Sequence, residues 1–162
     1  MQLYAFYLGG KAEKANIEVH DVVFLVSKDW SKETDKIKAK WFGDPSSVHI
    51  DAVAEISGNE NTVIKIDSSD KGLDNKLFFI NFGGSQQGVF SESHENGFFI
   101  AQNKSEAISQ AKKFLCTKFD DIHLDNLLDV DDCLEVSSFV DNKLIFVKGK
   151  GHVNITTCYK KI

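Results

Sequence analysis

The chain has 162 residues, 42% of them apolar and 27% charged, which suits one compact domain or two small units that share a core. All nineteen cations are lysine and the net charge is −5, which argues against nucleic acid or an anionic membrane as a partner. No apolar run approaches the roughly 18 residues of a membrane span, and the first residues lack the basic start of a signal peptide, so we expect a cytoplasmic protein.

The pattern of apolar residues predicts strands and two helices. Residues Leu3–Leu8 are apolar and aromatic and predict a buried strand that ends at Gly9-Gly10. A polar loop and a second strand follow, and Ser31 can cap a helix that runs to about Phe42. In chain order, the predicted elements are a strand at 3–8, a loop at 11–16, a strand at 18–27, a helix at 31–42, strands at 48–56 and 61–66, a helix at 105–117, and strands at 142–147 and 152–159.

The same order of features occurs twice. A shift of 74 positions lays Leu3–Ile56 on Leu77–Val130 without a gap, and Asn61–Ile66 resembles Asn142–Val147 at a shift of 81. A fixed offset is the signature of a repeated supersecondary unit. Ten positions are identical: Leu3/Leu77, Gly9/Gly83, Gly10/Gly84, Glu18/Glu92, His20/His94, Phe24/Phe98, Ser31/Ser105, Lys38/Lys112, His49/His123 and Asp51/Asp125.

The repeat leads to a prediction of the fold. We predict an α+β fold made by internal duplication of a β-β-α-β-β unit, with pseudo-two-fold symmetry and helices packed on a mostly antiparallel sheet. The first unit should span residues 1–70 and the second 75–150, followed by a C-terminal strand within 151–162. A unit of about 70 residues with one helix leaves a sheet face uncovered, so the two units should form one compact domain.

The repeated histidines and carboxylates are the candidate site. Glu18 and His20 are two residues apart in a predicted strand, as are His49 and Asp51, so each pair shares a face. If the two strands are close, His20, His49 and Asp51 could bind a divalent metal, or a histidine could act as a general base beside a carboxylate. Asp21 would add a carboxylate nearby, with Glu95 in its place in the second copy. The second copy of the cluster consists of Glu92, His94, His123 and Asp125.

Structural roles compete with these functions. Histidine–carboxylate pairs often only orient strands, and we favour such a role over metal binding. The pairs Gly9-Gly10 and Gly83-Gly84 lack a phosphate-binding fingerprint and suggest turns with positive φ or a close backbone approach between the two units. Trp41 should cover the sheet. Cys116, Cys133 and Cys158 have no zinc spacing and are expected to be buried, reduced thiols.

The first copy resembles a known bacterial family, domain of unknown function number 1543. The resemblance consists of a glycine pair after the first strand, E-x-H-D entering the second strand, then W-F-G-D-P and H-x-D. In the second copy W-F-G-D-P is replaced by LCTKF, so that copy could be degenerate. The resemblance implies a bacterial protein and brings no established activity.

Two functions remain open from the sequence. The first is a non-catalytic module that binds a protein partner or a small polar ligand through the loops after the glycine pairs, Lys11–Ile17 and Ser85–Ser91. We favour this function because no nucleophile motif or cofactor fingerprint is present. The second is a divalent-metal-dependent enzyme that uses Glu18, His20, His49 and Asp51, and hydrolysis is one reaction that such a site could catalyse.

Overall fold

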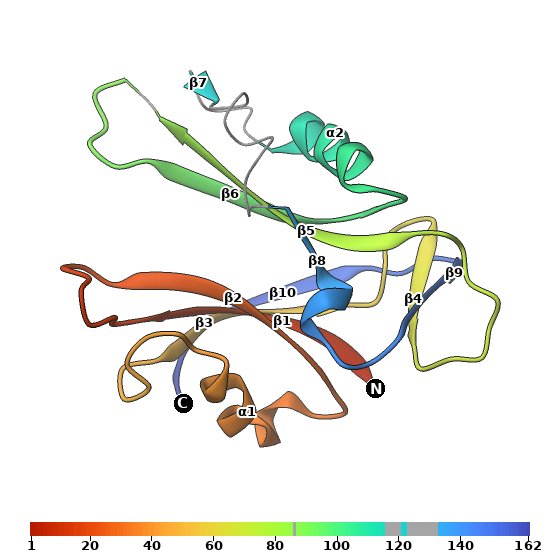
Figure 1. Cartoon of the computed structure of the whole chain (residues 1–162), viewed down its shortest axis with the longest axis horizontal. Helices are drawn as coiled ribbons and strands as arrows, with labels where there is room; N and C mark the ends of the chain where they lie inside the picture. The colour runs from red at the N-terminus through yellow and green to blue at the C-terminus, as the bar shows by residue number, and fades with distance from the viewer. Residues whose placement is uncertain (86, 116–120, 123–132) are drawn as a thin grey trace. The chain divides into compact units, whose positions relative to one another are not determined.

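The computed structural model describes residues 1–85, 87–115, 121–122 and 133–162 (Figure 1). The chain divides into two units, one made of Met1–Lys71 with Phe139–Ile162 and the other of Gly72–Ser138. The fold is mixed α+β, with mostly antiparallel strands and few helices. Of the helices that the structure describes, none is long and apolar enough to cross a membrane.

A four-stranded antiparallel sheet forms most of the first unit. Its strands are β1 (Gln2–Gly10), β2 (Val19–Ser27), β3 (His49–Ile56) and β10 (Val153–Lys161), in the order β10-β3-β1-β2. β1 is central and almost wholly buried, as its run of apolar residues predicts. A separate two-stranded ribbon pairs β4 (Thr62–Ile66) with β9 (Leu144–Lys148).

The predicted helix at 31–42 is shorter and interrupted in the structure. A 3₁₀ turn, η1 (Trp30–Lys32), precedes α1 (Thr34–Ala39). Asp29, rather than the predicted Ser31, caps the 3₁₀ turn, because its side chain accepts a hydrogen bond from the Ser31 backbone N–H at 3.1 Å. The N-cap residue of α1 is Glu33, whose side chain makes no capping hydrogen bond. Glu33, with φ −115°, separates the two turns.

The helix side of this sheet carries an apolar core. Trp41 lies just after α1 and is 7% exposed, so the prediction that it is a covering residue is confirmed. Within this core the indole Nε1 of Trp41 is buried without a hydrogen-bond partner in the part of the chain that the structure describes. The core consists of Tyr4, Phe6, Leu8, Val23, Ile37, Trp41, Val48, Ile50 and Val53.

The second unit repeats the start of the first. β5 (Lys76–Ser85) and β6 (Ser93–Ala101) form an antiparallel pair, followed by α2 (Lys104–Phe114). Asn103, rather than the predicted Ser105, caps α2 by accepting from the Glu106 N–H at 3.0 Å. The remaining elements are β7 (Asp121–Ile122) and β8 (Cys133–Glu135), both paired with β5, and the 3₁₀ turn η3 (Val136–Phe139).

After the helices, the boundaries of the sequence repeats differ from those of the two structural units. At a shift of 74, the third strand of the second copy corresponds to residues 123–130, which lie outside the described residues. The predicted strand at 142–147 is found as β9, and β9 pairs with β4 in the first unit although the sequence places it in the second repeat.

The cysteines differ from expectation in their burial. Cys133 and Cys158 are free thiols, as predicted, but each is only half-buried. Burial raises the pKa of the Cys133 thiol, which keeps that group protonated at neutral pH. Cys116 lies outside the described residues.

Candidate functional site

The predicted residues of the first copy come together on the face of the sheet opposite α1. Glu18 directly precedes β2, His20 lies on β2, and His49 and Asp51 lie on β3. Gly9 of the central strand pairs with His20 on one side and with His49 on the other. Directly paired residues of antiparallel strands present their side chains on the same face, so both imidazoles flank Gly9.

A bulge in β3 places Asp51. Ile50 pairs with Leu8 and Ala52 pairs with Tyr7, so Asp51 is an extra residue with no partner on β1. The pairing with β10 shifts at the same place. Bulges of this kind re-aim side chains beside functional sites. The bulge thus positions the carboxylate of Asp51 beside both histidines.

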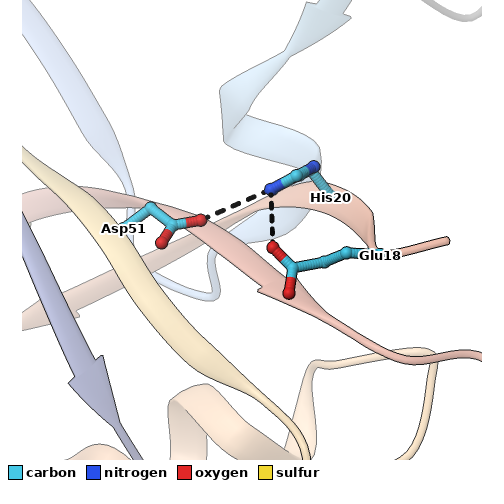
Figure 2. A group of neighbouring side chains, drawn as sticks. All are labelled: Glu18, His20 and Asp51. Carbon is cyan, nitrogen blue, oxygen red and sulfur yellow. Dashed lines mark ion pairs between the residues drawn. The ribbon is translucent and has the colours of Figure 1, made fainter.

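The four side chains form a closed ring of alternating imidazoles and carboxylates. His20 Nε2 lies 3.4 Å from Glu18 Oε1 and 3.5 Å from Asp51 Oδ2, and Figure 2 shows its ring nitrogen directed at both carboxylates. His49 Nε2 lies 3.3 Å from Asp51 Oδ1 and 3.6 Å from Glu18 Oε1. Donor atoms of Glu18, His20 and Asp51 all lie within 4.8 Å of one another, a spacing that could hold a metal ion.

The ring is anchored on one side and open on the other. The His49 side chain is 3% exposed, whereas those of His20, Glu18 and Asp51 are 39%, 51% and 29% exposed. His49 Nδ1 lies 3.3 Å from the Ser47 carbonyl oxygen. That contact favours a proton on Nδ1 and leaves Nε2 free to act as an acceptor or ligand.

Two tyrosines that the sequence analysis missed border the ring. Tyr7 stacks on the His20 imidazole, with ring centroids 5.4 Å apart and planes at 15°, and Tyr159 packs on His49 with centroids 4.4 Å apart. Burial, and then the negative charge of Asp51, raises the pKa of the Tyr7 phenol. Tyr7 has a sequence signal, because it lies two residues before Gly9 and so on the same face. Tyr159 has none, because β10 has no repeated counterpart.

The glycine pair has a role other than the predicted turn. β1 continues through Gly10, and the glycines with positive φ in the described residues are Gly58, Gly88 and Gly149. A Cβ on Gly9 would lie 2.7 Å from His49 Nε2 and 2.8 Å from Asp51 Oδ2. The positive-φ prediction is therefore wrong for Gly9, and the missing side chain gives room for the ring to close over the strand.

Asp21 does not belong to the ring. It pairs with Leu8, a core residue on the α1 face, so its side chain lies on the opposite side of the sheet from His20. The prediction that it adds a nearby carboxylate is wrong for this reason. Burial raises the pKa of the Asp21 carboxyl, partly opposed by the hydrogen bond that the Val22 N–H donates to it.

In the second copy, half of the cluster can be described. His94 Nε2 lies 3.7 Å from Glu92 Oε2, and His94 pairs with Gly83 as His20 pairs with Gly9. A Cβ on Gly83 would lie 2.8 Å from Glu92 Oε1 and 3.1 Å from His94 Nε2. His123 and Asp125 lie outside the described residues.

Comparison with known proteins identifies the family. The sequence model of Domain of Unknown Function (DUF1543) matches residues 15–66 and 90–138, one segment in each copy. These segments cover more than half of the chain, so the chain belongs to this family, with two tandem copies of its repeated segment.

The fold has a counterpart among solved structures. The chain is similar to the crystal structure of a protein Il1583 from Idiomarina loihiensis, with a TM-score of 0.68 and 23% identity. The similarity covers 98% of this chain and 96% of that chain, and at this identity it indicates a shared fold. No match was found among curated proteins.

Proposed function

We propose that the first unit is a binding module for a divalent metal ion, held by Glu18, His20, His49 and Asp51. Two imidazoles and two carboxylates are a ligand set suited to zinc, iron or manganese. All four residues come from one sheet face of one unit, and three of them approach from β2 and β3 on either side of Gly9.

The main support for the proposal is the set of distances between nitrogen and oxygen atoms within the ring. Its four nitrogen–oxygen separations are 3.3–3.6 Å. Charge-assisted hydrogen bonds between nitrogen and oxygen are shorter, at about 2.7–2.9 Å. Ligands about 2.1 Å from a tetrahedral metal are about 3.4 Å from one another, by simple geometry from usual zinc distances. The donor atoms of Glu18, His20 and Asp51, all within 4.8 Å of one another, are close enough to share one ion, and His49 lies 3.3–3.6 Å from the two carboxylates.

The competing role is a polar network that only stabilises the sheet. Three of the four side chains are about one-third to one-half exposed. Exposed ion pairs contribute about 0–1 kcal/mol to stability. These points support metal binding over a packing role.

The same proposal extends to the second copy. Glu92 and His94 repeat Glu18 and His20 around Gly83, and the sequence supplies His123 and Asp125 at the positions of His49 and Asp51. The structural support in this copy is limited to Glu92 and His94, since His123 and Asp125 lie outside the described residues.

The test is metal titration of protein purified without a histidine tag and stripped with a chelator. We expect calorimetry to show Zn²⁺ binding that His20→Ala weakens beyond the roughly 10- to 100-fold typical of losing an outer-shell partner. His20 is the residue of choice because it is partly exposed, whereas His49 is buried. The matched control is His152→Ala, an exposed histidine outside the ring, which should bind Zn²⁺ as the wild type does. Unchanged affinity in His20→Ala would refute the site.

A second candidate function is the non-catalytic binding of a partner through the loops at 11–17 and 85–91. Its support is that both hairpins present apolar side chains to solvent. Ile17 is 80% exposed, Phe90 is fully exposed and Val89 is about half exposed. The test replaces 11–17 and 87–91 with Gly/Ser and compares partner capture; a hydrolytic function would instead appear as metal-dependent turnover lost in His49→Ala.

The duplicated unit is proposed to be β-β-α-β-β. In the first copy the order β1, β2, α1, β3, β4 supports it, and in the second copy β5, β6 and α2 do. The last strand of each proposed unit, β4 and β9, pairs with the other in the ribbon. Such reciprocal pairing of equivalent strands is what a pseudo-two-fold arrangement of the repeats would produce.

A further inference from the structure

The ring of Glu18, His20, His49 and Asp51 has an open side. His49 closes the inner side, while His20, Glu18 and Asp51 are reached by solvent. Structural metal sites are closed by their protein ligands, whereas sites that act on a ligand keep a position open. Four protein ligands fill a tetrahedral shell, so the proposed open position requires an ion that accepts five or six ligands, with that position on the solvent side. The groups that border this side determine what could join the ion.

The last strand supplies two such groups. Lys161 pairs with His49 in the register of β10 on β3, so its side chain lies on the face of the ring. Tyr159 lies on the same face, because its ring packs on His49. Both side chains are exposed. Within the described part of the chain, Lys161 has no salt-bridge partner.

The neighbouring lysine has a different environment. Lys160 pairs with Ile50, a core residue on the α1 face, and its Nζ lies 4.9 Å from the centroid of the Trp30 ring. The alternation of the strand therefore directs one lysine to the ring and the other away from it. Lys161 is therefore the residue to test, and Lys160 is its matched control.

Charge decides which ligand the open side favours. With neutral imidazoles, Glu18 and Asp51 give the ring a charge of −2 and repel anions. A divalent ion neutralises that charge, and Lys161 then leaves the neighbourhood positive. A metal with an open position binds oxygen ligands, and a lysine ammonium is a point-charge partner for phosphate or carboxylate.

We propose that the metal-loaded ring binds the oxyanion group of a small ligand, a phosphate or a carboxylate, with Lys161 as the second cation and the Tyr159 hydroxyl as a hydrogen-bond donor. This proposal rests on the proposed metal site. It makes anion binding conditional on the metal, because the metal-free ring has the wrong charge. Tyr7, stacked on His20, borders the ligand on the other side.

The experiment uses Co²⁺-loaded full-length protein, freed of excess metal by gel filtration, with inorganic phosphate in one arm and acetate in the other. We expect paramagnetic broadening of the phosphate phosphorus signal or of the acetate methyl signal, and the arm that responds identifies the oxyanion. Broadening should be absent with Zn²⁺-loaded protein, which is diamagnetic.

The lysine pair provides the decisive comparison. Lys161→Met should weaken anion binding by about two- to fivefold, the range of an exposed ion pair, with unchanged Co²⁺ affinity. Lys160→Met should bind the anion as the wild type does. If Co²⁺ binds and neither anion responds, or if both lysine variants behave alike, the anion proposal is overturned while the metal site stands. If Co²⁺ itself does not bind, both proposals fail.

Discussion

Gly9→Ala perturbs the proposed metal site most specifically, because it leaves the chemistry of all the proposed ligand side chains unchanged. The new Cβ would lie 2.7 Å from His49 Nε2, whereas ordinary contact begins at 3.4 Å. Restoring contact requires a shift of about 0.7 Å, the difference between these two distances. Metal–ligand distances tolerate about 0.2 Å. The substitution should therefore displace His49, Asp51 or both beyond what a bound ion accepts.

The expected loss is about 10- to 100-fold in Zn²⁺ affinity, the effect of disturbing groups that orient metal ligands. The assay is calorimetric titration of chelator-stripped protein, with circular dichroism to show that the fold is retained. Gly9 is not among the residues with positive φ, so its backbone accepts alanine. Without the ring above it, Gly9→Ala would stabilise the protein by about 0.4–1 kcal/mol.

Gly10→Ala is the matched control for this experiment. It adds a methyl group at the next position of the same strand, where the Cβ would lie 3.0 Å from Ser47 Oγ and from the Trp41 ring. It should lower thermal stability and leave Zn²⁺ affinity unchanged. Wild-type affinity in Gly9→Ala, or an equal loss in both variants, would refute the reasoning that the missing side chain serves the site.

Three further predictions concern the scaffold. Trp41→Ala should cost about 3–5 kcal/mol in urea unfolding, because the ring is 7% exposed within the core; no change would contradict its place there. Asn103→Ala should cost about 0.5–2 kcal/mol by removing the cap of α2, and Asn103→Asp should restore most of it. Asp21→Asn should raise the melting temperature at pH 7, since burial raises the pKa of this carboxyl in the folded state. Stability from that raised pKa is present in acid and is lost as pH rises through the folded-state value, so the advantage of Asn should vanish below the ordinary pKa of aspartate.

The sequence predicted which polar side chains share a face better than it predicted the elements around them. The i, i+2 spacing of Glu18 with His20 and of His49 with Asp51 is enough to place each pair on one face. That the two pairs meet depends on β1 lying between β2 and β3, with Gly9 paired to both histidines. Long-range strand order is not visible in local periodicity, so the convergence could only be assumed.

The failures have local causes. Ser31 looked like a helix cap, but Asp29 caps the 3₁₀ turn that precedes α1, and in the second copy Asn103 caps α2. Asx side chains cap helices at least as well as serine, so the presence of a serine did not identify the cap. Gly9-Gly10 resembled a turn because glycine is most often needed for its backbone conformation. Here Gly9 is needed because a Cβ at this position would clash with His49 and Asp51.

The bulge at Asp51 sets the geometry of the ring in the first copy. A regular strand would already place His49 and Asp51 on one face, about two residues apart along β3. The extra residue leaves Asp51 without a partner on β1, and its carboxylate lies 3.5 Å from His20 on β2 as well as 3.3 Å from His49. A bulge breaks ladder hydrogen bonds and leaves a residue unpaired, which gives the sheet itself no stability. The bulge lies at Asp51, which like Glu18 contacts both histidines, over the glycine that leaves room for them, and this position fits the proposed site better than a role in packing the sheet.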